Sequence, residues 1–99
     1  MVYEHGELVF EWDENKNLIN EKKHGITFEM AALVFEDPYC VEMYDFEHSI
    51  DEDRYIAIGE VCEVLFVAYT ERKDNIRLIS ARLATAAERR MYYDEDIRC

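Results

Sequence analysis

The chain has 99 residues, 49% of them hydrophobic and 34% charged, and its 11 Lys and Arg against 23 Asp and Glu give a net charge of −12. A chain of this length makes one domain that can fold without a disulfide or a structural metal, and this composition excludes a chain that is disordered throughout. The negative charge argues against general nucleic-acid binding, because contacts with phosphates supply most of that affinity.

The N-terminal residues and the cysteines bear on where the protein acts. The first ten residues, MVYEHGELVF, contain two acids and no basic segment, so they do not predict a secretory signal. No apolar run approaches the roughly 20 residues that cross a bilayer. Cys40, Cys62 and Cys99 form an odd set without CxxC spacing, which is typical of free thiols in a reducing compartment. We therefore expect a cytoplasmic protein with no membrane contact.

The first expected elements are a strand and a helix. Residues 8–12, LVFEW, are rich in strand formers and predict a strand. Asp13 is a suitable helix N-cap, and Gly25 follows a positively charged last turn, so a helix is expected between them. This helix contains few apolar residues, and we expect Leu18 and Ile19 to form the narrow stripe that faces the core.

A second helix is expected after Thr27, which can cap it. The spacing i, i+3, i+4, i+7 gives this helix one apolar face made of Phe28, Ala31, Ala32 and Phe35. Asp37 and Pro38 end it, because proline disfavours helix at the residue before it and cannot donate the next hydrogen bond.

The second half of the chain predicts strands and a final helix. The expected strands are residues 40–44, 54–59, 64–69 and 76–83, with an acidic loop at residues 45–53. The strand at 64–69 is apolar at every position, so we expect it to be central and covered on both faces. Thr85 and Glu88 have the spacing of a capping box and begin the last helix.

The order is thus β-α-α-β-β-β-β-α, which predicts an α+β fold in which helices pack against a small antiparallel sheet. We expect one domain over residues 1–99, with its ordered core at about residues 8–93. The side chains expected in the core are Phe28, Phe35, Leu65, Phe66, Val67 and either Leu78 or Ile79.

Positive charge is concentrated in one segment, residues 72–90. It contains six of the eleven Lys and Arg and only two acids, so its local balance is +4 in a chain of net −12. Charge asymmetry of this kind indicates an anionic ligand or partner, or else one half of an internal salt-bridge pattern.

Several short motifs follow one another in a familiar order. They are FEWDENK at residues 10–16, KHGITF at 23–28, VFED at 34–37, D-x-x-H at 45–48, the spacing of acidic and basic residues at 71–82, and A-x-x-x-ER at 84–89. In this order and spacing the chain resembles the BrnT family, the toxins of type II toxin–antitoxin pairs, which are similar to the RelE group of ribonucleases. The resemblance covers nearly the whole domain, from Phe10 to about Tyr93.

The resemblance implies a small metal-independent endoribonuclease with a RelE-like fold and no cofactor, which arrests translation by cleaving RNA. It also implies a partner antitoxin of the BrnA type, whose ribbon-helix-helix domain binds operator DNA, so that DNA is reached only through the antitoxin. The candidate catalytic residues that it implies are Lys23, His24, Arg54, Arg72, Arg77, Arg82 and Arg89.

Cleavage of RNA without a metal requires a base for the 2′-OH, cations for the phosphorane and an acid for the leaving 5′-oxygen. Lys23 and His24 could supply acid–base groups, or could serve only as cations at a helix C-terminus. Arg77 and Arg82 are five residues apart, so a regular strand would send them to opposite faces unless a bulge intervenes. Arg82, next to the capped helix, is the stronger candidate for a phosphate contact, and the alternative is a surface ion pair.

Other residues allow two interpretations each. Arg89 and Arg90 point about 100° apart on a helix, so we expect one to reach the site and the other to reach solvent. Tyr92 and Tyr93 could stack on RNA bases, but tyrosines on a terminal helix pack more often on the core. His48 stands among acids, which suggests either a metal-binding loop or a solvated loop that docks onto a basic partner.

Three functions remain open at the level of the sequence. The first is a ribonuclease toxin, monomeric in fold, which the antitoxin inhibits by covering the basic segment. The second is a non-catalytic interaction module that binds a partner and co-represses transcription, which the acidic charge favours. The third is a stand-alone metal-binding domain that uses His48 and its neighbouring acids.

Overall fold

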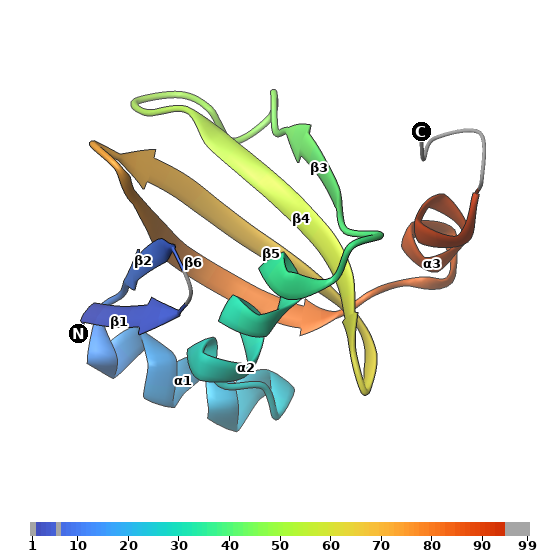
Figure 1. Ribbon diagram of the computed structural model, residues 1–99, viewed down its shortest axis with the longest axis horizontal. Helices are drawn as coiled ribbons and strands as arrows, with labels where there is room; N and C mark the ends of the chain where they lie inside the picture. Colours follow the sequence, from blue (N-terminus) through green and yellow to red (C-terminus); the bar gives the residue numbers. More distant parts are fainter. Residues whose placement is uncertain (1, 6, 95–99) are drawn as a thin grey trace.

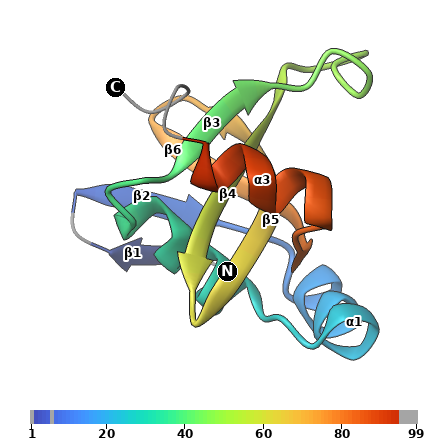
Figure 2. The ribbon, with the colours of Figure 1, turned by 90° about the vertical axis from the view of Figure 1, so that its right-hand side faces the viewer.

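The computed structural model describes residues 2–5 and 7–94, which form a six-stranded sheet with helices on both faces (Figure 1). The strands are β1 (Val2–His5), β2 (Leu8–Glu11), β3 (Val41–Tyr44), β4 (Arg54–Val61), β5 (Glu63–Arg72) and β6 (Asn75–Leu83). The helices are α1 (Glu14–His24), α2 (Phe28–Ala32), the 3-10 helix η1 (Leu33–Glu36) and α3 (Ala86–Tyr93). Helices α1, α2 and η1 lie on one side of the sheet, and α3 lies across the other side over β4 and β5 (Figure 2).

The sheet is mixed, which corrects the expectation of an antiparallel sheet. Its strand order is β1-β2-β6-β5-β4-β3, and β3 to β6 form the expected antiparallel meander. Strand β2, however, pairs with β6 in parallel, with Phe10 opposite Ile76 and Glu11 opposite Arg77. Strand β1 was not expected at all; it pairs antiparallel with β2 and extends the sheet by one strand. Its sequence, VYEH, is too short and polar to predict a strand by itself.

The three predicted helix starts and the predicted end of α1 are confirmed, whereas the expected second helix is divided into α2, which ends at Ala32, and η1. Asp13 caps α1 by accepting backbone hydrogen bonds from the first turn, and Gly25 ends the helix in the left-handed conformation with φ 73°. Thr27 caps α2 in the same way. Thr85 and Glu88 form both hydrogen bonds of a capping box at the start of α3. The local sequence therefore determines where the helices begin.

The inner face of α1 is the reverse of the expected one. Leu18 and Ile19 are 55% and 56% exposed, whereas Asn17 and Asn20 are buried. The Asn20 amide donates to the Ala81 carbonyl at 2.8 Å and accepts from the Ala81 N–H at 3.2 Å. Strand β2 ends opposite Arg77, and none of the described strands pairs with the rest of this edge of β6. The Asn20 side chain takes the place of a strand's peptide group there, which is why an amide is buried where an apolar residue was expected.

Replacing Asn20 by alanine should lower the free energy of unfolding by about 2–3 kcal/mol, because it leaves buried backbone groups of β6 without partners. Chemical denaturation of the purified protein measures this loss. Asn15→Ala on the exposed side of the same helix is the matched control and should change stability by less than about 0.5 kcal/mol. If Asn20→Ala and Asn15→Ala change the free energy of unfolding equally, water takes over the hydrogen bonds of the Asn20 amide and the expectation is wrong.

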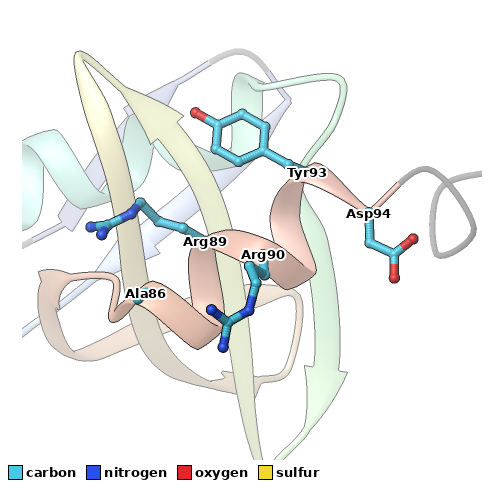
Figure 3. A pocket seen from close by; sticks show the side chains of 5 residues that line it. All are labelled: Ala86, Arg89, Arg90, Tyr93 and Asp94. Carbon is cyan, nitrogen blue, oxygen red and sulfur yellow. The ribbon is translucent and has the colours of Figure 1, made fainter.

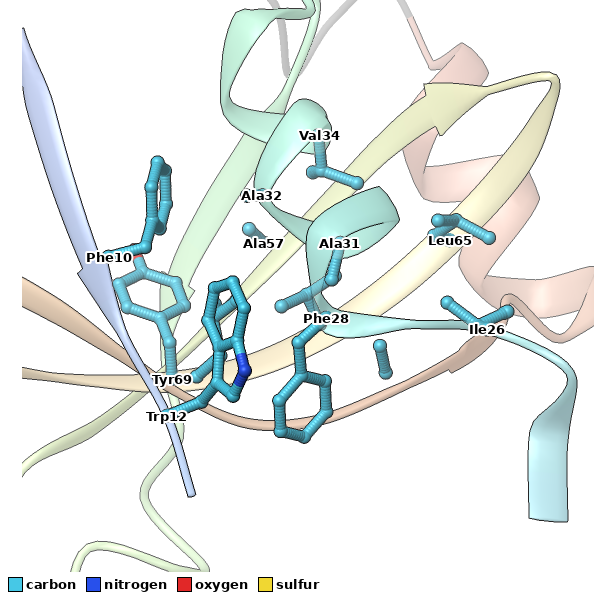
Figure 4. Close-up of a cluster of buried hydrophobic side chains, with 13 residues drawn as sticks. Phe10, Trp12, Ile26, Phe28, Ala31, Ala32, Val34, Ala57, Leu65 and Tyr69 are labelled. Carbon is cyan, nitrogen blue, oxygen red and sulfur yellow. The ribbon is translucent and has the colours of Figure 1, made fainter. Parts of the chain in front are cut away.

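The main core lies between the sheet and helices α2 and η1 (Figure 4). Of the expected core residues, Phe28, Leu65, Val67 and Leu78 are buried. Phe35 and Phe66 are only partly buried and pack at the margins of two separate clusters. The largest side chains with almost no exposed surface are Trp12, Phe10 and Phe28.

A second, smaller cluster lies under α3. It consists of Ile58, Val64, Ala84 and Tyr92, so β5 is covered on both faces as expected. Tyr92 packs on the core, as tyrosines on terminal helices more often do, and its hydroxyl donates to Asp37. Asp37 also accepts the Glu60 N–H at 2.8 Å, so its carboxylate connects α3 to β4.

Candidate active site on one face of the sheet

A bulge in β6 decides where the candidate arginines point. In the pairing of β5 with β6, Ala68 stands opposite Ser80 and Tyr69 opposite Leu78, so Ile79 is an extra residue. Side chains alternate between the two faces of a strand, and one extra residue reverses this alternation for the residues that follow it. Arg77 and Arg82 therefore lie on the same face of the sheet, which was the condition for both to belong to one site.

Two further arginines share this face. Thr70 of β5 stands opposite both Arg54 of β4 and Arg77 of β6, and residues opposite each other on neighbouring strands point to the same side. Arg72 is two residues beyond Thr70 on the same strand and so points the same way. We call Arg54, Arg72, Arg77 and Arg82 the arginine face. Helix α3 covers the other end of this side of the sheet, over Ile58 and Phe66.

Three members of the arginine face are paired with carboxylates. Arg77 lies 3.4 Å from Glu11, and Arg72 lies 3.9 Å from Glu52. Arg82 makes two hydrogen bonds to Glu88, at 2.7 and 3.0 Å. The internal salt-bridge pattern left open by the sequence is thus present, and it neutralises much of the local positive charge. The first two pairs are long, so they add little to stability.

The Arg82–Glu88 pair is the best formed of the three. The planar guanidinium binds both carboxylate oxygens and lies 4.0 Å over the ring of Phe66. The hydrogen bond from Arg82 lowers the pKa of Glu88, and the same bond raises the pKa of Arg82, so both groups stay charged. Glu88 also closes the capping box of α3. A phosphate that binds Arg82 must therefore displace Glu88 or share the guanidinium with it.

Arg54 differs from the other three arginines. Among residues 2–5 and 7–94 no carboxylate forms an ion pair with it. Its side chain is partly buried and lines a shallow pocket of about 300 Å³ together with Ile50 and Glu52. It is therefore the member of the arginine face whose guanidinium can take an anion without first releasing a carboxylate.

Lys23 and His24 end α1 and lie apart from the arginines. Among the described residues neither makes a hydrogen bond or ion pair with an arginine. They follow Asn20, which binds Ala81, by one turn, so this end of α1 lies alongside the C-terminal half of β6, which carries Arg82 (Figure 1). The structure thus brings them to the same end of β6 as Arg82, but α1 lies on the opposite side of the sheet from the arginine face.

Arg89 follows Glu88 in α3 and points about 100° away from it. Its guanidinium donates to the Ala84 carbonyl at 3.2 Å, and it lines a pocket of about 310 Å³ with Glu60 and Glu63. Figure 3 shows Arg89 and Arg90 diverging at a second pocket, of about 600 Å³. The contacts and pockets of Arg89 include no member of the arginine face, so the structure does not join Arg89 to it.

The structure places His48 within hydrogen-bond distance of Asp45. Its Nδ1 atom lies 2.8 Å from Asp45 Oδ2. Within the part of the chain that the structure describes, no three His, Cys, Asp or Glu side chains come together as possible metal ligands. None of the described helices is long and apolar enough to span a membrane.

A family model described as the ribonuclease toxin BrnT of type II toxin–antitoxin systems matches residues 12–88. The chain belongs to the BrnT family. The crystal structure of the Brucella abortus ribonuclease toxin BrnT matches with a TM-score of 0.57 and 25% identity, over 77% of this chain and 95% of that one. A comparison with curated proteins found no match. The BrnT match includes every candidate residue except Arg89, which lies one residue beyond it.

Sequence reasoning missed the acidic members of this region. Glu11 and Glu52 come from β2 and from the acidic loop, far from the arginines in sequence, and no local pattern indicates that they meet. Glu88 was interpreted only as a capping residue, and its second contact depends on the turn between β6 and α3. In this BrnT-family chain the carboxylates are as much part of the arginine face as the arginines.

Proposed function

We propose that this chain is a metal-independent endoribonuclease that arrests translation in the cytoplasm and is neutralised by a BrnA-like antitoxin. Two observations support the proposal: the BrnT family match over residues 12–88 and the gathering of four arginines on one side of the sheet. We also infer kinship with the RelE group of ribonucleases. Operator DNA is then reached only through the ribbon-helix-helix domain of the antitoxin.

The proposed reaction uses the 2′-OH of the RNA itself as nucleophile. A base removes its proton, the oxygen attacks the neighbouring phosphorus, and an acid protonates the departing 5′-oxygen, which leaves a 2′,3′-cyclic phosphate. Arg54, Arg77 and Arg82 would hold the non-bridging oxygens as negative charge develops there. We propose Lys23 and His24 for the acid–base steps; they end α1, one turn after Asn20, which binds Ala81 of β6.

The acidity of the chain determines how RNA must bind. With a net charge of −12, long-range attraction is absent, and RNA is held by local contacts within about 10 Å at ordinary salt. Arg54 can bind a phosphate directly. Arg77 and Arg82 must first release the carboxylates of Glu11 and Glu88 and then bind the phosphate in their place. A guanidinium suits this exchange because it holds two oxygens of either group in the same geometry.

If Arg82 binds phosphate, Glu88 competes with RNA. Glu88→Gln removes this competitor and keeps an oxygen for the capping box, so RNA should bind about three- to tenfold more tightly, as expected for about 1 kcal/mol. Fluorescence anisotropy with a labelled RNA measures the affinity. Glu63→Gln, which removes the same charge from an exposed position, is the control. If the Glu88→Gln and Glu63→Gln variants bind RNA with equal affinity, Arg82 pairs with Glu88 only and does not contact a phosphate.

The second candidate function is the non-catalytic module that binds a partner and co-represses transcription. This function is favoured because carboxylates within the chain already form ion pairs with Arg72, Arg77 and Arg82. Expression of the chain alone in a bacterium separates the two. Growth arrest that co-expressed antitoxin relieves supports the toxin. Normal growth with soluble, folded protein supports the module.

A further inference from the structure

Among residues 2–5 and 7–94, no strand pairs with the outer edge of β3. Strand β3 is the last strand in the order β1-β2-β6-β5-β4-β3, and the Asp45 N–H donates to the Arg54 carbonyl at 2.9 Å. Hydrogen-bonded pairs alternate along an antiparallel ladder, so Val41 and Met43 also bond to β4. The N–H and C=O groups of Glu42 and Tyr44 consequently point away from the sheet. An edge of this kind can pair with a strand from another chain.

Large apolar side chains are exposed beside this edge. Phe46 and Ile50 are each 84% exposed, and Tyr39 and Tyr44 are 57% and 38% exposed. The Phe46 ring packs edge-on against the Tyr44 ring, with the two ring centroids 4.7 Å apart. A fixed turn presents these side chains, because the Ser49 hydroxyl donates to the Asp45 carbonyl at 2.6 Å and accepts from the Arg54 N–H at 2.8 Å. Exposed apolar groups on an ordered turn indicate a contact surface.

The charge of this region indicates what kind of partner can bind to it. Residues 36–53, which we call the acidic edge, contain eight Asp and Glu and no Lys or Arg. Two copies of this chain would repel each other if their acidic edges met. A basic segment would be attracted, and opposite charges across an interface favour both association and correct partner choice.

We propose that the acidic edge binds an extended, basic segment of the antitoxin, which adds to β3 as a seventh strand. The inference rests on the proposed function, since it assigns a docking place to the antitoxin named there. Backbone groups of Glu42 and Tyr44 pair with the segment, Phe46 and Ile50 contact its apolar side chains, and the loop acids contact its Lys or Arg. Arg54 begins β4, so the bound segment is separated from it by β3, and the acidic edge is a docking place beside the arginine face and not on it.

The test compares two double variants of this chain for binding to purified full-length antitoxin by calorimetry. Phe46→Ser with Ile50→Ser removes the exposed apolar groups of the acidic edge. Leu18→Ser with Ile19→Ser removes a similar apolar area from α1, where the residues are 55% and 56% exposed. The first pair should weaken binding at least about tenfold and the second less than about twofold.

A second comparison tests strand addition itself. Glu42→Pro removes the outward N–H without breaking the ladder to β4, whereas Glu42→Ala keeps that N–H and removes only the charge. Proline should weaken antitoxin binding more than alanine does. Hydrogen exchange of the Glu42 and Tyr44 amides should slow when wild-type protein binds the antitoxin. Circular dichroism confirms that each variant is folded.

The outcomes separate this inference from the proposed function. If wild-type protein binds the antitoxin and the acidic-edge variants bind as tightly, the docking place is wrong while the toxin assignment stands. If wild-type protein does not bind the antitoxin at all, both are overturned. If light scattering shows a dimer of wild-type protein that the Phe46 and Ile50 changes dissociate, the edge is occupied by a second copy and the inference fails.

Discussion

Replacing Phe28 by alanine is expected to lower the free energy of unfolding by about 3–5 kcal/mol, because it removes a large buried ring and leaves a cavity. Phe28 has no exposed surface and packs edge-on against Trp12 with ring centroids 6.1 Å apart. Its position is fixed further by the backbone, since its N–H donates to Asn17 Oδ1 at 2.8 Å. The surroundings therefore have little freedom to collapse into the space. Denaturant unfolding followed by circular dichroism gives the change.

The matched control for this prediction is Phe46→Ala. It removes the same ring from a side chain that is 84% exposed, so stability should change by less than about 0.5 kcal/mol. Phe35 and Phe66 should give intermediate losses, since both are only partly buried. A Phe28→Ala variant no less stable than the Phe46→Ala variant would show that helix α2 does not pack on the sheet in this register.

Replacing Arg82 by lysine should reduce the rate of RNA cleavage by about 10²–10³-fold while the protein stays folded. Lysine keeps the charge but lacks the planar fork that can hold two phosphate oxygens. The same change weakens the bidentate pair with Glu88, so unfolding must be measured beside cleavage. Arg90→Lys, on the outer side of α3, is the control and should cleave at the wild-type rate.

Two results would remove Arg82 from the site. One is a lysine variant that cleaves RNA as fast as the wild type. The other is a loss of cleavage that follows a loss of stability in proportion, since Arg82 would then act only by holding Glu88 and the start of α3. Together with Glu88→Gln, these variants separate a phosphate contact from a purely structural ion pair.

The local parts of the fold could be predicted from the sequence. Capping residues determine the starts of α1, α2 and α3 and the end of α1, and apolar runs determine the central strand β5. The parallel pairing of β2 with β6 could not be predicted, because it joins segments more than 60 residues apart and leaves no periodic signal. The buried Asn17 and Asn20 were missed because pattern reasoning assigns polar residues to solvent unless their partners are known.

The candidate site was predictable in its residue types and less so in its geometry. A run of arginines in residues 72–90 indicated an anion site. That Arg77 and Arg82 share a face depends on the bulge at Ile79, for which the sequence ISAR gives no local signal. The pairing with Glu11 and Glu52 likewise depends on long-range contacts. That Arg89 is not joined to the other arginines depends on the position of α3 across the sheet.

The proposal that this chain is a metal-independent ribonuclease is tested most directly by incubating the antitoxin-free protein with a long RNA in excess EDTA. The account predicts internal cleavage that leaves 2′,3′-cyclic phosphate ends, proceeds at the same rate with and without EDTA, and stops when antitoxin is added. The Arg82→Lys protein, purified in the same way, controls for contaminating nucleases. RNA that stays intact at every protein concentration, or cleavage that EDTA abolishes, would contradict the account.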